Sequence, residues 1–106
     1  MLGRFVYRGE TVDYKATKDL AYGEVVEIGS RIGIAAAVIK NGEVGTLNIT
    51  GVYELTATSS EEYKIGDIVY FKEEGVTKTK ASNEPVAGIV VAEKKNGATT
   101  ALVKID

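Results

Sequence analysis

The stretch AYGEVVEIG at 21–29 is followed by a similar stretch, YKIGDIVYF, at 63–71. Each places a glycine and an acidic residue directly before a run of β-branched residues, so that the segment 23–26 matches the segment 66–69. A glycine followed by an acid is typical of a tight turn, and the run that follows has the composition of a strand. The sequence therefore predicts that one turn-and-strand element is used twice.

A second set of matches extends this similarity at a larger offset. It joins Gly33-Ile34-Ala35, Asn41-Gly42 and Leu47 to Gly88-Ile89-Val90, Asn96-Gly97 and Leu102. The second offset exceeds the first by the length of the segment KEEGVTKTKASN at 72–83. The chain is therefore predicted to contain two related β units, the second with an inserted hairpin. Two units suit the two halves of a closed or nearly closed barrel, which leaves no strand edge exposed.

The composition favours an all-β protein. Among 106 residues there are 12 glycines and one proline, and β-branched and aromatic residues fill short runs between the glycines. The segments 24–28 and 68–71 read as strands, and GTLNITGVYEL at 45–55 alternates along its length. Its inward-facing residues are Leu47, Ile49, Tyr53 and Leu55. Gly51 interrupts the pattern and predicts a bend or a bulge. The predicted fold is a compact small β-barrel or sandwich.

The turns add more detailed predictions. Asn-Gly occurs at 41–42 and at 96–97 between apolar runs, and it is typical of the type I′ hairpin turn, which needs a positive φ at both central residues. A third hairpin is expected in FKEEGVTKT at 71–79, with Glu74-Gly75 at its tip. The stretch SSEEY at 59–63 predicts one short helical turn, because a serine can cap it and the acids lie at its positive end.

The chain length suits one domain with a single core. Residues 1–14 precede the first repeated element and are expected to form an N-terminal arm or a first strand. Residues 15–106 are expected to form a single β-barrel-like domain. No apolar run approaches the length needed to span a membrane, and the N-terminus lacks the apolar core of a secretion signal. The protein is therefore expected to act where it is made, or to be carried away in an assembly.

The sequence lacks the residue types that several kinds of chemistry require. The chain has no Cys and no His, which removes disulfides, thiol nucleophiles, imidazole catalysis and the commonest metal ligands. A formal charge of −2 argues against nucleic-acid binding, which usually needs a basic face. No cofactor, metal or catalytic residue is predicted. The eight aromatic side chains are assigned to core and interface packing in preference to base stacking.

Two weaker candidates for chemistry are present. GSRIG at 29–33 has the glycines of a phosphate-binding loop but lacks its Lys-Ser/Thr ending, so a tight turn between strands is the better interpretation. Glu24 and Asp67 occupy matching turn positions and could serve as a pair of general acid and base. An acid directly after a turn glycine more often accepts local backbone N–H groups, which is the preferred interpretation.

The N-terminal stretch GRFVYRGETVDYKAT is the best candidate for an interaction site. It has the alternation of an amphipathic strand but no hairpin partner in sequence. Such a strand either completes the sheet of its own chain or adds to a sheet edge of another subunit. The residues assigned to this interface are Phe5, Tyr7, Val12 and Tyr14. Deleting residues 1–14 is expected to leave a folded domain that has lost this binding.

The motifs, taken in order, resemble those of a family of small tailed-phage and prophage proteins, the capsid decoration or head cement proteins. The resemblance covers nearly the whole chain. It rests on FVYRGETVDYKAT, GEVVEIGSRIGIAAAVIKNGEVGTLNITGVYELT, YKIGDIVYF and GIVVAEKKNGATTALVKID. Some members carry a recombinase label, which this chain does not support because it lacks an ATP-binding loop, the length and a basic surface.

The resemblance implies a non-enzymatic protein on the outside of a matured phage head. Its implied partners are the major capsid protein and further copies of itself in a homotrimer, with no nucleic acid and no membrane. Its implied location is the virion surface, after synthesis in the cytoplasm of the bacterial host. Two alternatives remain: an adaptor in the tail or neck of the virion, and a small enzyme or ligand-binding β-barrel. The last of these predicts a deep pocket with convergent polar groups.

Overall fold

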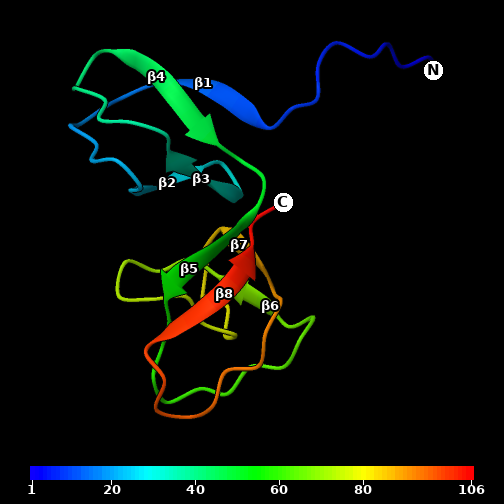
Figure 1. The fold of residues 1–106 in the computed structure, drawn as a ribbon, viewed down its shortest axis with the longest axis vertical. Coiled ribbons are helices and arrows are strands. Elements are labelled where there is room, and N and C mark those ends of the chain that lie inside the picture. The colour runs from blue at the N-terminus through cyan, green and yellow to red at the C-terminus, as the bar shows by residue number, and fades with distance from the viewer.

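The computed structural model describes residues 1–106 and contains eight β-strands and no helix (Figure 1). The strands form two four-stranded sheets in which all neighbours are antiparallel. Sheet 1 contains β1 (Thr11–Lys15), β2 (Val25–Ile28), β3 (Arg31–Ala35) and β4 (Val44–Asn48). Sheet 2 contains β5 (Val52–Thr56), β6 (Ile68–Tyr70), β7 (Val86–Val90) and β8 (Thr100–Lys104). The prediction of an all-β fold is confirmed.

The two sheets repeat one topology. Their strand orders are β1-β4-β3-β2 and β5-β8-β7-β6, so each strand of sheet 1 has an equivalent in sheet 2. The pairing agrees in detail, because Val26 lies opposite Gly33 and Val69 lies opposite Gly88. We call residues 10–50 unit 1 and residues 51–106 unit 2. The prediction of two related β units is confirmed.

One proposed equivalence shifts along the chain. The equivalent of Leu47 is Val103 and not Leu102, since Leu47 pairs with Ala35 and Val103 pairs with Val90. Leu47 and Val103 are fully buried, whereas Leu102 is 40 % exposed. A shift of a single position in strand register moves a side chain to the opposite face, which is why Leu102 points outward.

The inserted segment lies between β6 and β7. In unit 1 the corresponding strands β2 and β3 are joined directly by Gly29 and Ser30. In unit 2 the chain runs through residues 71–85, and Tyr70 and Thr77 exchange backbone hydrogen bonds of 2.8 and 3.0 Å. The predicted hairpin is therefore present, although it forms a single isolated bridge and no regular strands. Its tip is Glu73-Glu74 and not Glu74-Gly75, because the N–H of Gly75 bonds to the carbonyl of Lys72 at 3.0 Å.

The Asn-Gly turns differ from the prediction. Gly42 and Gly97 have φ of +87° and +97°, but no residue other than glycine has a positive φ. A positive φ at the second central residue alone is the pattern of a type II turn, so the type I′ prediction is wrong. The physical reason is the pairing of the strands. β3 pairs with β4 only around Ile34 and Ala35, and each Asn-Gly turn lies in a longer connection.

The helical turn predicted at 59–63 is absent. The segment forms a hydrogen-bonded turn from Thr58 to Glu61, and Tyr63 then pairs with Lys94 through two backbone bonds of 3.0 Å. This pair is equivalent to Leu20 and Ile39 in unit 1. Long-range pairing with the loop before β8 therefore outweighs the local helical preference of the sequence.

The buried residues form two clusters. The unit 1 cluster consists of Ala16, Leu20, Val26, Ala35, Ile39 and Leu47. The junction cluster contains Ile32 and Ile34 of β3 together with buried residues of unit 2: Leu55, Ala57, Tyr63, Val69, Val76, Ala87, Val90, Ala101, Val103 and Ile105. Both sheets keep two edge strands, so the units do not close a common barrel.

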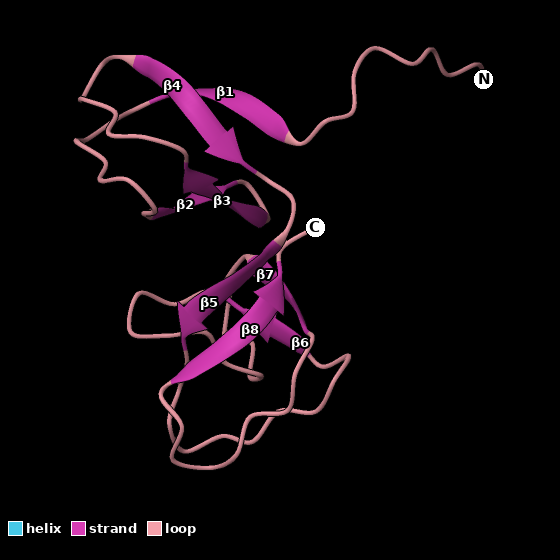
Figure 2. Cartoon of the chain, viewed as in Figure 1, coloured by secondary structure: helices cyan, strands magenta, loops and turns pink.

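β3 connects the two clusters. Successive side chains of a strand point to opposite faces, so Ala35 enters the unit 1 cluster while Ile32 and Ile34 enter the junction cluster. Burying an isoleucine side chain stabilises a fold by about 1.5–3 kcal/mol. Figure 2 shows sheet 1 above sheet 2, with β2 and β3 on the side that faces unit 2. Unit 2 therefore covers one face of sheet 1.

Gly51 marks the crossing between the sheets. The alternating stretch 45–55 is divided there into β4 and β5, which belong to different sheets. Gly51 has a φ of +108°, a value that side chains rarely permit. The predicted bend at Gly51 is confirmed, but the stretch does not form one continuous strand.

Candidate interaction surfaces

The two acids considered as a catalytic pair each serve their own turn. Glu24 Oε1 accepts the backbone N–H of Ala21 at 3.0 Å, and Asp67 Oδ2 accepts that of Lys64 at 2.8 Å. The bond from Ala21 is the main cause that lowers the pKa of Glu24; desolvation opposes it, and Lys18 at 3.4 Å adds to the lowering. Both carboxylates have the local turn role that the sequence favoured.

The GSRIG stretch is the tight turn between β2 and β3. Ile28 pairs with Arg31, which leaves Gly29 and Ser30 as the central residues of the turn. Gly29 has a φ of +64°, and a positive φ at the first central residue alone is the pattern of a type II′ hairpin turn. The preferred interpretation of this stretch is therefore confirmed.

A cleft of about 650 Å³ lies between the units. It is lined by 15 residues, of which 7 are hydrophobic, and they come from both units. Tyr14 and Val25 line it from unit 1, and Leu55 and Phe71 line it from unit 2. The polar groups of Lys18 and Glu24 in its wall are directed at each other and at the turn. The lining thus combines apolar side chains with an ion pair that is already formed.

The four residues of the predicted N-terminal interface fall on either side of Thr11, where β1 begins. Residues before Thr11 belong to no strand, and Phe5 and Tyr7 are 81 % and 66 % exposed. Figure 1 shows this segment extending away from both sheets. Val12 and Tyr14 instead lie in β1, opposite Leu47 and Gly45 of β4. The strand has thus found a partner within its own chain.

Val12 and Tyr14 also contribute to the core. Both are half-buried and pack against the unit 1 cluster, as does Ile28. A Cβ at position 45 would lie 2.5 Å from side-chain atoms of the buried Ile39, so a larger residue there would displace Ile39. The structure therefore does not bring the four predicted interface residues together. Phe5 and Tyr7 form one exposed group, and Val12 and Tyr14 form the rim of a core.

A polar network fixes the inserted segment of unit 2. The carboxylate of Glu61 accepts the hydroxyl of Thr77 at 2.9 Å and the backbone N–H of Lys78 at 3.0 Å. The single hydroxyl proton of Tyr63 is shared between Glu61 at 3.0 Å and the backbone carbonyl of Val76 at 2.7 Å. Tyr63 is buried, and its pKa is raised, first by burial and then by Glu61. The ammonium of Lys94 donates to the backbone carbonyl of Glu61. These residues join the loop before β6 to the insertion.

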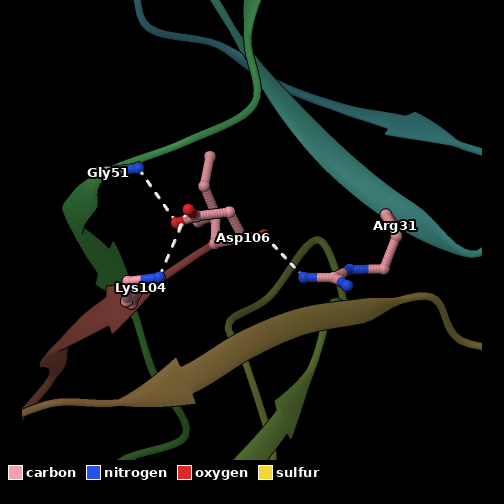
Figure 3. A network of polar contacts seen from close by, with 5 residues as sticks. Arg31, Gly51, Lys104 and Asp106 are labelled. Atoms are coloured by element: carbon pink, nitrogen blue, oxygen red, sulfur yellow. Dashed lines mark hydrogen bonds and ion pairs between the residues drawn. The ribbon is translucent and has the colours of Figure 1, made fainter. Parts of the chain in front are cut away.

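The C-terminus ties the two units together. Arg31 of β3 donates to the Ile105 carbonyl at 2.7 Å. The Asp106 carboxylate accepts the backbone N–H of Gly51 at 3.1 Å and pairs with Lys104 at 3.2 Å (Figure 3). The N–H of Gly51 is the main cause that lowers the pKa of Asp106. The last two residues thus contact both the crossing point and sheet 1.

Sheet 2 carries an exposed apolar surface that the sequence alone does not reveal. The register places Val52 opposite Lys104, Lys104 opposite Ile89, and Ile89 opposite Ile68. Leu102 lies on the same face, next but one to Lys104 in β8. We call these five residues the outer row. Glu54 shares this face and lies opposite Leu102. Assembling the row requires the register of all four strands.

The structure contains no helix with the length and apolar character needed to span a membrane, and no group of three or more acidic, Cys or His residues placed to hold a metal ion.

The fold and these surfaces define a small all-β protein of two related units with an exposed N-terminal segment. The sequence model of the family described as phage cement protein matches residues 6–105, nearly the whole chain. The chain belongs to this family, which confirms the resemblance drawn from the motifs. Membership gives it a structural role at the head of a bacteriophage. No curated protein and no solved structure matches the chain.

Proposed function

We propose that the protein binds the outside of a mature phage head, contacts the major capsid protein and stabilises the capsid lattice without catalysing a reaction. The observation that carries this proposal is the match to the phage cement protein family over residues 6–105. The local roles of Glu24 and Asp67 support the non-enzymatic part, because they account for the acids that could have formed a catalytic pair.

The stabilising effect follows from linkage. A protein that binds the assembled lattice but not the separate subunits shifts the equilibrium toward the lattice by mass action. Many copies, each of modest affinity, add their contributions when they bridge neighbouring capsid subunits. A homotrimer at the local three-fold positions of the lattice would provide this bridging, and we propose that assembly state. Before assembly the protein would reside in the cytoplasm of the host.

The N-terminal segment supplies a contact for the capsid. Phe5 and Tyr7 expose large side chains on a segment without strand pairing, and such a segment can order on a partner by strand addition or by filling pockets. Ordering a chain segment costs conformational entropy, so aromatic anchors are needed to offset it. Of the four residues predicted from sequence, Phe5 and Tyr7 are the ones we assign to the capsid contact.

The proposal is tested by sedimenting the purified protein with mature, expanded heads that lack it. Saturable binding, with a copy number that is a multiple of three at each junction of capsomers, is the expected result. A protein found at the tail or neck of the virion, with no binding to expanded heads, would instead support an adaptor role. Unchanged thermal stability of heads after the protein has bound would contradict the stabilising role.

A further inference from the structure

The outer row of sheet 2 has an equivalent in sheet 1, and the two rows differ in what covers them. In sheet 1 the row consists of Thr11, Asn48, Ile34 and Val25, by the register of β1, β4, β3 and β2. Ile34 is 3 % exposed because it enters the junction cluster, and Val25 packs against the same cluster. Unit 2 therefore covers the apolar half of this row.

In sheet 2 the same positions are uncovered. Ile68 is 51 % exposed and Ile89 is 40 % exposed, although they are the equivalents of Val25 and Ile34. The apolar character also extends further, because Val52 stands where sheet 1 has Thr11. The ammonium of Lys104 is drawn to Asp106 at 3.2 Å, which leaves its aliphatic stem along the row. The exposed row is thus more apolar than the covered one.

We propose that the outer row of sheet 2 binds a second copy of this chain, at the rim of the copy's unit 1 cluster. Within one molecule, the row of sheet 1 is covered by the buried apolar residues of unit 2. The apolar cluster of a unit with this topology is therefore the kind of surface that covers such a row. The half-buried Tyr53 of unit 2 packs against the junction cluster. Its equivalent in unit 1 is Val12, which packs against the unit 1 cluster. Tyr14 and part of the unit 1 cluster line the cleft that faces unit 2 of the same chain, whereas Val12 and Ile28 lie outside that cleft.

The resulting contact is head-to-tail. The donor surface is the outer row, and the acceptor surface is the rim formed by Val12, Tyr14 and Ile28, which are all half-buried in the isolated chain. Head-to-tail contacts produce a ring when the rotation closes and an open filament when it does not. This inference adds a specific contact to the homotrimer of the proposed function. The expected number of three copies in the ring rests on that proposed function. It requires no capsid.

The test uses the full-length protein in analytical ultracentrifugation over a range of concentrations. Wild type is expected to self-associate, and the double variant Ile68→Lys with Ile89→Lys is expected to weaken association at least about tenfold. Ile65→Lys is the matched control, because Ile65 is 69 % exposed at a turn tip and lies outside the row. Thermal unfolding checks that each variant is folded.

Mixing distinguishes this contact from a symmetric one. The outer-row double variant retains the acceptor rim, and a Val12→Lys variant retains the outer row. Each alone is expected to be monomeric, while an equimolar mixture is expected to form a dimer that grows no further. A double variant that still associates like wild type, or a mixture that stays monomeric, overturns the proposal.

Binding to phage heads, measured for wild type and the double variant, distinguishes a second copy from the capsid as the partner of the outer row. A wild-type protein that is monomeric at every concentration, together with a double variant that no longer binds heads, would assign the outer row to the capsid and overturn the second-copy assignment. Self-association that depends on the outer row, without any binding to heads, would leave this inference standing while the proposed function fails.

Discussion

The guanidinium of Arg31 in unit 1 donates a hydrogen bond to the backbone carbonyl of Ile105 in unit 2, at 2.7 Å and across 74 residues of sequence. The neighbouring residue Ser30 reinforces this link, because its carbonyl accepts the backbone N–H of Val86 at 2.8 Å. The β2–β3 turn is therefore attached both to the C-terminus and to the start of β7. These bonds hold Ile32 and Ile34 in the junction cluster.

Replacing Arg31 with methionine is expected to destabilise the protein by about 1–2 kcal/mol, because it removes a hydrogen bond from a charged donor to a partly buried carbonyl while it keeps an unbranched stem. For a chain of this size the melting temperature should fall by roughly 4–8 °C for each kcal/mol. Calorimetric melting measures the effect. The control is Arg8→Met in the exposed N-terminal segment, and equal effects of the two substitutions would contradict the role given to Arg31.

Gly88 leaves no room for a side chain beside the backbone of β8. Its φ is +150°, and a Cβ there would lie 2.0 Å from the backbone oxygen of Lys104. Gly88→Ala is therefore expected to cost about 3 kcal/mol or more, since backbone in a paired strand cannot move aside. Gly97→Ala is the comparison, because φ there is +97° but no atom lies within 4 Å, so about 1 kcal/mol is expected. Chemical denaturation of both variants checks the order, which the reverse result would refute.

The features predicted correctly from the sequence are those that local chemistry determines. The turn at Gly23 and its equivalent at Gly66 each need a positive φ and an acid that accepts a turn N–H, so the same residues recur at both places. The bend at Gly51 is local in the same sense. Such positions reveal the repeat because the turn requires particular residues next to one another in the sequence.

The features missed from the sequence depend on strands that are distant in the chain. The partner of β1 is β4, and nothing near Val12 or Tyr14 in the sequence indicates that pairing. The helical turn at 59–63 fails for the same reason, because Tyr63 pairs with Lys94. The outer row joins four strands, so its residues can be recognised as one surface only once the register is known.

Glu61 should make the stability of the protein depend on pH in the acid range. Burial of this carboxylate is the largest single influence and would raise its pKa, but the bonds from Lys78, Thr77 and Tyr63 together lower the pKa from 4.5. A lowered pKa in the folded state adds stability above the unfolded pKa, and this stability is lost as the pH falls through the folded value. Glu61 should therefore stabilise the protein at neutral pH and not below its folded pKa.

The variant Glu61→Gln isolates this contribution. The difference in unfolding free energy between wild type and Glu61→Gln is expected to be largest near pH 7 and to shrink as the pH falls below about 4.5. Denaturant titrations across that range provide the measurement. Glu62→Gln, at the exposed neighbouring position, should show a small difference that stays constant. A gap between wild type and Glu61→Gln that does not change with pH would mean that the carboxylate is not the group responsible.

Because β1 begins at Thr11, the N-terminal segment that can be removed without loss of a strand is shorter than residues 1–14. Deleting residues 1–14 would take away most of β1, expose the edge of β4 and remove Val12 and Tyr14 from the rim of the unit 1 cluster. Deleting residues 1–9 removes only the residues that precede this pairing. The shorter deletion is therefore expected to change the unfolding free energy by less than about 0.5 kcal/mol, whereas the longer one should destabilise the protein strongly.

The shorter deletion then tests the capsid contact without disturbing the fold. It is expected to reduce binding to expanded heads, and the double substitution Phe5→Ala with Tyr7→Ala should reduce binding in the same direction, because both exposed aromatic anchors are lost. Gly3→Ser in the same segment is the control. Co-sedimentation with heads gives the affinity. Binding at full strength after removal of residues 1–9 would exclude the N-terminal segment as the anchor and leave the folded units to make the contact.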